Sequence, residues 1–312
     1  MPANPEELNR TIKSLAFAQG FCACGIIQAQ YLEQDDYALR EWVAQGRHGQ
    51  MDYLARNQEK RADIRLLVPG ARSVIALAHS YLTVESRDIS RRTGIAKYAL
   101  GEDYHKVLKD KMHALCTELK KTAGEFSYRV FTDSAPVAER RIAQRAALGW
   151  IGKSSLFIVP GAGSYVFLSE IVTDLDIAPE TDAQPNRCGA CRRCRMACPT
   201  GAIDGQGTID ARRCLSYATI ELKDPTPEAL AEHLNGQVFG CDVCLDACPW
   251  NRQTTTTDEP RFQPLSLLRR IRRDDWTTMS EGTFRDELTN SPLQRAGLDK
   301  IRNTALLVEK EK

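Results

Sequence analysis

The sequence predicts a mixed α+β and α/β fold in three parts: an α/β domain at 1–177, a small cysteine-rich module at 178–255 and a short helical region at 256–312. Three observations support this division. Predicted helices and strands alternate as far as Asp176. A stretch rich in proline and polar residues, 177–186, then has the composition of a linker. Eight of the eleven cysteines follow, between Cys188 and Cys248.

Local signals place the elements of the first part. Asn4 precedes Pro5 and two glutamates, which is a helix-start pattern, and the apolar spacing that follows predicts a helix ending at Gly20. Further helices are predicted at 31–43, 103–121 and 137–149, and strands at 21–27, 73–82 and 128–133. The segments 156–159 and 164–173 are predicted to pair as a hairpin across the turn at Pro160.

The composition is that of an ordinary globular protein. Hydrophobic residues make up 42% and charged residues 27%, with a net charge of +1, so bulk charge gives no argument for nucleic-acid binding. No run approaches the ~18 apolar residues of a membrane span, and MPANPEELNRTIKSLAF lacks the apolar centre of a signal peptide. We therefore expect a cytoplasmic protein without a membrane partner, whose reduced cysteines serve metal binding or catalysis.

The cysteine module contains a ferredoxin pattern. In CGACRRCRMACP, 188–199, four cysteines are spaced two, two and three residues apart and a proline follows, as in bacterial ferredoxins with [4Fe–4S] clusters. The fourth cysteine of such a run binds the other cluster of a pair, so a partner run is needed. CDVCLDACP, 241–249, is that run, but it lacks a leading cysteine, and Cys214 is the nearby thiol that can replace it.

This pattern predicts two clusters with four thiolates each. The predicted ligands are Cys188, Cys191, Cys194 and Cys248 for one cluster, and Cys198, Cys214, Cys241 and Cys244 for the other. Zinc is the alternative, but zinc sites usually pair one CxxC with a second CxxC or with histidines. Two neighbouring clusters carry single electrons and perform no substrate chemistry, so we expect the reaction to take place in the preceding domain.

Asp133 is the candidate reactive residue of that domain. No GxGxxG follows a strand and no GxxxxGK[ST] occurs, so a nucleotide site of either kind is not indicated. Asp133 lies where a predicted strand ends and a helix begins, a place where α/β domains commonly bind ligands. The alternative is that Asp133 or Ser134 only caps that helix, which is the more frequent role at such a position.

Several motifs in the same order resemble the epoxyqueuosine reductases, and the resemblance extends from the N-terminus to about residue 310. The segments that carry it are MDYLARN (51–57), RLLVPGARSVI (65–75), KYALGEDYH (97–105), VFTDSAPVAER (130–140), GWIGKSS (149–155), the run 188–199 and FGCDVCLDACPWNR (239–252). The resemblance implies reduction of epoxyqueuosine to queuosine at the wobble position of tRNA. It also implies a cobalamin held between the first domain and the cluster module.

In such an enzyme the clusters reduce the cobalt, low-valent cobalt attacks the epoxide, and the aspartate of the TDSAP-like motif gives a proton. That aspartate is Asp133 here, and as a general acid it is expected to have a raised pKa, which burial beside the apolar face of the corrin would supply. No stretch fits the Asp-x-His-x-x-Gly pattern, so we expect base-off cobalamin without a histidine ligand, and His105 as a polar contact. The predicted cofactor contacts are Arg56, Lys97, Tyr98, Asp133, Ser134, Ala135, Lys153 and Ser154.

The resemblance implies two partners, the tRNA anticodon loop and an external low-potential electron donor, and we expect a monomer. Two groups of arginines are candidates for contact with tRNA phosphates, one at 192–213 and one at 269–273, with Trp250 as a stacking residue. Compensation of cluster charge and a solvated helix face are the alternatives for the two groups. Many members of the family continue into C-terminal helical repeats, and 291–308 looks like the start of such a region.

Two other functions compete with this interpretation. A reductive dehalogenase shares the plan of a corrinoid domain followed by two clusters, but usually has an exported leader and a tyrosine proton donor. A non-catalytic electron carrier with a large docking domain predicts neither a corrinoid nor RNA binding.

Overall fold

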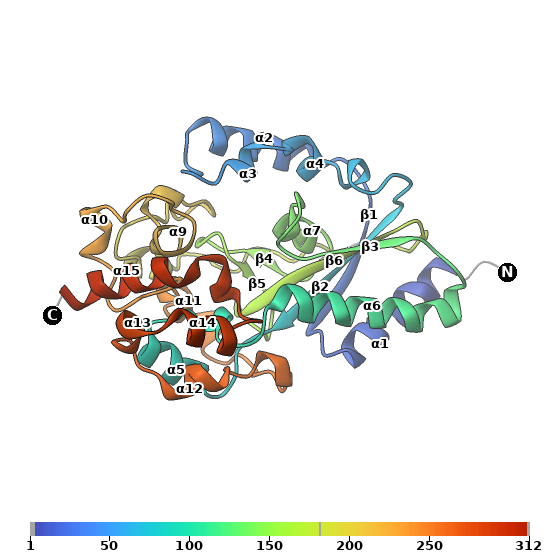
Figure 1. Ribbon diagram of the computed structural model, residues 1–312. Helices are drawn as coiled ribbons and strands as arrows, with labels where there is room; N and C mark the ends of the chain where they lie inside the picture. Colours follow the sequence, from blue (N-terminus) through green and yellow to red (C-terminus); the bar gives the residue numbers. More distant parts are fainter. Residues whose placement is uncertain (1–3, 181, 311–312) are drawn as a thin grey trace.

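A four-stranded sheet forms the centre of the first part of the chain (Figure 1). The computed structural model describes residues 4–180 and 182–310. The strand order is β1 (Ala23–Gln28), β2 (Ser73–Ser80), β6 (Val166–Thr173) and β3 (Tyr128–Phe131). Each neighbouring pair is antiparallel, so the α+β description fits this sheet better than a parallel α/β one.

Helices cover both faces of the sheet. On one face, α1 (Pro5–Ala18) and α6 (Tyr104–Ala123) contribute Ile12, Leu108 and Met112 to a core in which these side chains are fully buried. On the other face, α7 (Glu139–Arg145) buries Ile142 and Ala143. The first helix starts as predicted, because the side chain of Asn4 accepts a hydrogen bond from the amide of Glu6 at 3.0 Å.

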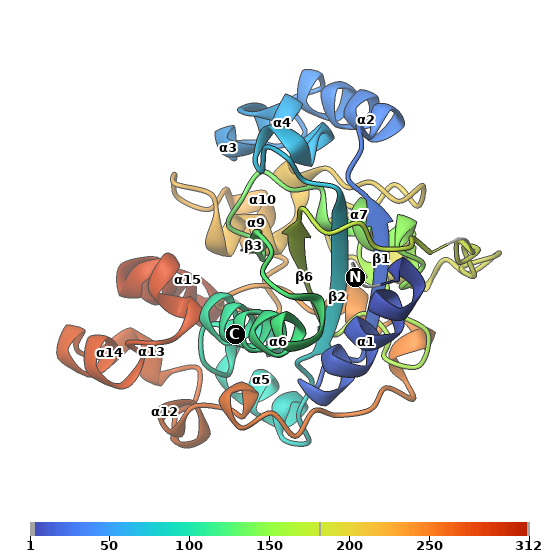
Figure 2. The same cartoon turned by 90° about the vertical axis from the view of Figure 1, so that its right-hand side faces the viewer.

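Three short helices stand apart from these layers. They are α2 (Glu33–Ala44), α3 (Asp52–Ala55) and α4 (Gln58–Ala62), and they lie above the sheet, well away from α1 and α6 (Figure 2). Side chains of α2 and α3 line a cavity together with Ile209 and Ala211 of the cysteine module. These helices therefore form one side of the functional site.

The predicted hairpin between 156–159 and 164–173 is wrong. The strand β5 (Phe157–Ile158) pairs with β4 (Trp150–Ile151) in a separate two-stranded sheet, while β6 joins the main sheet. The reason is that β6 has partners on both sides in the main sheet, with eight residue pairs along β2 and four along β3. A two-residue strand offers far fewer cross-strand contacts.

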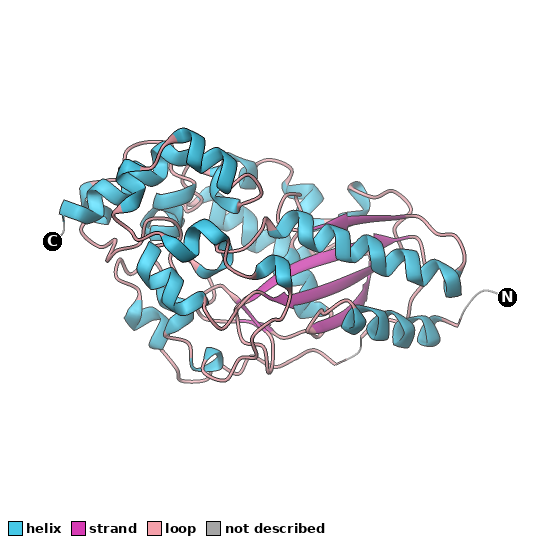
Figure 3. Cartoon of the chain, turned by 60° about the horizontal axis from the view of Figure 1, so that its bottom comes forward, coloured by secondary structure: helices cyan, strands magenta, loops and turns pink. Residues whose placement is uncertain are grey.

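The cysteine module contains little regular structure. Its helices are α8 (Arg193–Ala197), α9 (Leu215–Ile220), α10 (Glu228–Ala231) and α11 (Val243–Asp246). None of these helices has more than six residues, which is too short for a helix to be stable by itself. Strands are confined to the other end of the molecule (Figure 3).

The C-terminal region packs on both other parts. It consists mainly of α12 (Ser266–Arg270), α13 (Asp275–Thr278), α14 (Glu281–Glu287) and α15 (Gly297–Lys310). Its core includes Trp276 and Leu268 together with Ile95 and Leu100, which follow α5 (Ser86–Thr93), and Phe239 of the module. One apolar core therefore joins segments from all three predicted parts. Among the described residues, no helix is both long and apolar enough to cross a membrane.

Candidate functional site

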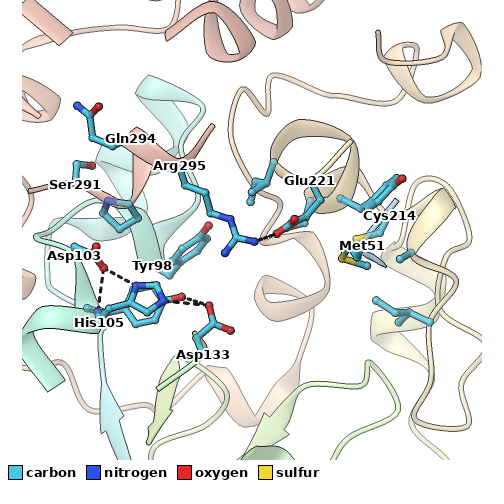
Figure 4. A pocket seen from close by; sticks show the side chains of 17 residues that line it. Met51, Tyr98, Asp103, His105, Asp133, Cys214, Glu221, Ser291, Gln294 and Arg295 are labelled. Carbon is cyan, nitrogen blue, oxygen red and sulfur yellow. Dashed lines mark hydrogen bonds and ion pairs between the residues drawn. The ribbon is translucent and has the colours of Figure 1, made fainter. Parts of the chain in front are cut away.

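A cavity of about 650 Å³ lies where the three parts of the chain meet. Its wall includes Tyr98 and Asp133 from the first part, Cys214 from the cysteine module, and Arg295 from the C-terminal region (Figure 4). A second cavity of about 390 Å³ lies beneath α2 and beside α7. The two cavities share Met51, Asp133, Ile209 and Ala211, so Asp133 stands at their junction.

Asp133 is not a helix cap. The strand β3 ends at Phe131 and α7 begins only at Glu139, with Ala138 at the N-cap and no side-chain capping hydrogen bond. Asp133 instead has a φ of 52°, in the left-handed region that side chains rarely adopt, although aspartate tolerates it better than most. Its amide donates a hydrogen bond to the carboxylate of Glu139, which holds the loop in this conformation. The capping alternative is therefore wrong.

Two side chains from the start of α6 approach the Asp133 carboxylate. The hydroxyl of Tyr104 donates to Asp133 Oδ2 at 2.5 Å, and His105 Nε2 lies 3.5 Å from the same oxygen (Figure 4). The other ring nitrogen of His105, Nδ1, is 2.7 Å from Asp103 Oδ1. The Asp133 side chain keeps 49% of its surface accessible, and it lines both cavities.

These contacts decide the charge of Asp133. Burial raises the pKa of Asp133, but hydrogen bonds from His105 and Tyr104, with the charges of His105 and Arg295, outweigh it and set the pKa below its usual value. Burial lowers the pKa of His105, but the two aspartates raise it to about 9. The expected raised pKa of Asp133 is wrong for the protein without ligands, because the sequence did not show its two neighbours on α6.

Two further carboxyl groups lie behind the Asp133 loop. Burial, with the nearby charge of Asp133, raises the pKa of Glu139 to about 8. Glu170 on β6 is completely buried, and neither of its oxygens has a hydrogen-bond partner among the described residues. Burial, with the nearby charge of Glu139, raises the pKa of Glu170 well above its usual value. Sequence reasoning missed both groups.

The cysteines of the module gather in two groups of four. The Cys248 thiol lies within electrostatic range of Cys188, Cys191 and Cys194, and α11 packs against α8 to bring them together. The Cys244 thiol lies in the same way near Cys198, Cys214 and Cys241. Among the described residues no three His, Cys, Asp or Glu side chains are placed to hold a single metal ion, whereas a [4Fe–4S] cluster distributes its four thiolates over four irons.

Comparison with known proteins follows the same division of the chain. Residues 61–134 match the family model "Epoxyqueuosine reductase QueG, DUF1730", and residues 187–251 match the model "4Fe-4S double cluster binding domain". An epoxyqueuosine reductase of Cyclobacterium marinum is 40% identical over 307 residues, covering 98% of each chain. Another from Pseudomonas aeruginosa is 38% identical over 311 residues, covering 98% of this chain and 86% of the relative.

The chain belongs to the epoxyqueuosine reductase family.

Solved structures of this family share the fold. An epoxyqueuosine reductase crystallised with a tRNA-Tyr stem loop that carries epoxyqueuosine aligns with a TM-score of 0.90 and 26% identity, covering 99% of this chain and 82% of that one. A Bacillus subtilis member, whose catalytic aspartate loop is swung out of the active site, aligns with a TM-score of 0.89 and 25% identity over the same shares. The family match confirms two [4Fe–4S] clusters as cofactors of the cysteine module.

The predicted cofactor contacts are scattered. Tyr98 and Asp133 line the larger cavity, whereas Arg56, Lys97, Ser134, Ala135, Lys153 and Ser154 line neither of the two. Lys97 is buried, and its ammonium lies 2.9 Å from Asp246 and 3.2 Å from Asp242, between the cluster cysteines. Lys153 donates to the carbonyls of Gly189 at 2.5 Å and Cys191 at 3.1 Å. Both lysines thus tie the first part of the chain to a cysteine loop.

Sequence reasoning missed several cavity residues, because nothing in the sequence shows which side chains of a motif face a cavity, and some of these residues lie outside every motif. They include Met51, Tyr104, Arg61, Tyr217 and Arg295. Arg61 lines the smaller cavity, and its Nε has no partner among the described residues, which makes it a candidate for an anionic or amide group of a ligand. His105, which was expected to be a polar contact, is one.

The candidate RNA contacts also differ in their surroundings. Arg269 pairs with Glu85 and Arg270 with Glu287, so these two guanidinium groups are already engaged. Arg212 pairs with Asp210 at 2.7 Å. The ring of Trp250 packs edge-on against Trp150, with 4.9 Å between centroids.

Proposed function

We propose that this protein reduces epoxyqueuosine to queuosine at the wobble position of tRNA. Two observations support this most strongly. The chain is 40% identical over 98% of its length to an epoxyqueuosine reductase, and the larger of the two cavities is lined by both Asp133 and a cysteine of the module, Cys214. This arrangement serves an enzyme better than a simple carrier, since a carrier needs no enclosed acid. The full-length family match likewise favours it over a dehalogenase.

Cobalamin is the cofactor that this cavity fits. Two adjoining cavities with shared walls offer a space longer than either, and polar groups from Tyr98, Arg61 and Arg295 face it. His105 is the one histidine in the lining of the two cavities, and both its ring nitrogens lie near carboxylates, so it would not be free to bind cobalt. When bound, cobalamin supplies a low-valent cobalt nucleophile for opening the epoxide.

The two cysteine groups serve as a path for electrons. Cys188, Cys191, Cys194 and Cys248 hold one cluster, and Cys198, Cys214, Cys241 and Cys244 hold the other. The placement of Cys248 near the first three thiols and of Cys198 near the last three supports this exchange of ligands. Because Cys214 lines the cavity, a cluster held by its group of four thiols would be the one able to supply electrons there.

Asp133 delivers the proton that the opened epoxide oxygen needs. Without ligands it is ionised, and the neighbouring His105 carries the proton at neutral pH. Negative charge that develops on the epoxide oxygen raises the pKa of the nearby Asp133 carboxyl. Asp133 then takes the proton from His105 Nε2 and passes it to that oxygen. Bound substrate and cofactor would bury the Asp133 carboxyl further. This burial would raise its pKa from the lowered value that it has without ligands.

The partners are a tRNA anticodon stem loop and an external low-potential electron donor, and the protein acts as a cytoplasmic monomer. A tRNA stem loop bound to a relative with a TM-score of 0.90 supports the first partner. To reach Asp133, the base of the anticodon loop would flip out of its stack and enter one of the two cavities that Asp133 lines.

The decisive experiment measures turnover of a tRNA stem loop carrying epoxyqueuosine, under anaerobic conditions, with and without cobalamin. We expect queuosine only when cobalamin and a low-potential reductant are both present. The visible spectrum of the reconstituted protein reports corrinoid binding separately. Bound corrinoid with no queuosine contradicts the proposed substrate, and iron–sulfur absorption without bound corrinoid contradicts the proposed cofactor.

A further inference from the structure

The two proposed clusters differ in their distance from the reaction cavity. Cys214 of the second cysteine group lines the larger cavity, while none of the four cysteines of the first group lines either cavity. In a relay that delivers electrons to the cavity through the second cluster, the first cluster is therefore the candidate point of entry. The loop that carries most of the first group, 187–199, lies toward the surface, with Gly189 and Ala190 exposed between its cysteines.

This loop presents a concentrated positive charge. Between Asp182 and Asp204 the chain has four arginines and no acidic residue. Arg187, Arg192, Arg193 and Arg195 are all exposed. Arg187 contacts only the Gln184 amide, at 3.4 Å, and the other three form no ion pair with any acidic residue that the structure describes. An exposed apolar side chain, Met196 at 80%, lies among them.

The second arginine group provides a contrast. Arg269 and Arg270 are each paired with a glutamate of the same chain, so part of their charge is already compensated. Unpaired guanidinium groups around one exposed apolar residue are what an acidic protein surface would bind, because steering needs uncompensated charge and docking needs some apolar contact. The arginine group at 187–195 has both the unpaired charges and, in Met196, the exposed apolar side chain.

We propose that the surface formed by Arg187, Arg192, Arg193, Arg195 and Met196 docks an acidic one-electron carrier protein, which delivers electrons to the first cluster. One electron leaves the redox centre of the carrier, which is oxidised, and enters the cluster, which is reduced; no bond changes and no proton moves. This inference rests on the proposed function, since it treats the clusters as an electron relay. It favours a protein partner over tRNA because the surface lies over the cluster that is remote from the cavity.

The test uses the iron-loaded protein and two reductants. The first is a photoreduced plant-type [2Fe–2S] ferredoxin, an acidic carrier protein, and the second is photoreduced 5-deazariboflavin, a small uncharged molecule. Stopped-flow bleaching of the cluster absorption gives the rate with each, over a range of salt concentrations. For the triple variant R192E/R193E/R195E we expect the ferredoxin rate to fall by roughly tenfold to a thousandfold at low salt. Its decline with added salt should also disappear.

The small reductant keeps the two proposals apart. Its rate should be the same in the variant and the unmodified protein, because it needs no docking surface. If it fails to bleach clusters even in the unmodified protein, the proposed electron relay fails. If it bleaches both proteins while the ferredoxin rate is also unchanged in the variant, the docking proposal is overturned.

A matched control changes the same number of charges elsewhere. R10E/K106E/K121E places them on α1 and α6, which pack against the sheet (Figure 1), and should keep most of the ferredoxin rate. If the first variant loads less iron, the neutral R192Q/R193Q/R195Q replaces it and should still flatten the salt dependence. Weaker binding of a tRNA anticodon stem loop, with an unchanged ferredoxin rate, would show that RNA occupies this surface and would overturn the proposal.

Discussion

The sheet region and the cysteine module are stabilised in different ways. Around the sheet, two large apolar clusters bury long helices and strands, and β2 is buried at all eight positions. In the module the helices have four to six residues, and its own apolar cluster has few members, such as Leu215 and Leu234. Where burial is this limited, metal–thiolate bonds have to supply the free energy of folding.

The site lies on the boundary between these two kinds of structure. Asp133 and His105 belong to the well-packed part, which holds them within hydrogen-bond distance of their partners. Cys214 belongs to the metal-dependent part and faces the same cavity. Apolar packing thus positions the proposed acid–base residues, whereas metal–thiolate bonds would hold the proposed electron carriers. The following variants test that difference.

The largest effect is expected from Cys214→Ser. This variant should lose about half of its iron, because one of two four-thiolate sites is broken. Hydrogen exchange should rise throughout 187–251 while the sheet region stays protected. Cys24→Ala is the control, because this thiol packs against the sheet core and should leave the iron content intact. Full iron content in Cys214→Ser would contradict the ligand assignment.

Asp133→Asn should lower turnover by roughly 10²–10⁴-fold, the usual contribution of a general acid. Both clusters and corrinoid binding should be unchanged, since the amide has nearly the same shape. Turnover is measured by the queuosine formed in a stem loop, with Asp88→Asn, at an exposed position of α5, as a control of equal charge change. Turnover near that of the unmodified protein would exclude Asp133 as the proton donor.

Lys97→Met tests the contact between the two regions. Removing the ammonium leaves the carboxylate of Asp242 buried without its cation, so the free energy of unfolding should fall by about 3–5 kcal/mol. Lys153→Met removes hydrogen bonds to two carbonyls only and should cost less, about 1.5–3 kcal/mol. Denaturant unfolding of the iron-loaded proteins compares the two, and equal losses would argue against a special role of the Lys97 ion pairs.

His105→Asn should change the pH dependence more than the fold. In the unmodified protein, kcat/KM should decline as the pH rises through about 9, because His105 is protonated below that value and loses its proton above it. In the variant this decline should begin about one pH unit lower or more, since no protonated histidine then lies beside Asp133. An alkaline limb at the same pH in both proteins would show that another group controls it.

Part of this site could be predicted from the sequence, and part could not. The sequence pointed to Asp133 and to seven of the eight proposed cluster cysteines because each belongs to a short local pattern, whereas Cys214 was proposed as the remaining nearby thiol. The environment of Asp133 was predicted wrongly, because Tyr104 and His105 approach it from α6, about 30 positions earlier in the chain. Glu170 was not suspected at all, since a single glutamate in an apolar strand carries no visible signal before its burial is known.

The sequence by itself determined the kind and number of metal centres, because thiolates a few residues apart must wrap the same iron cluster whatever surrounds them. Only the tertiary structure decided which cysteine lines the cavity and that the neighbours of Asp133 hold its pKa below the usual value. Both depend on groups from distant segments that meet in space. A pKa and an electron path are properties of such neighbours, and no spacing along the chain specifies them.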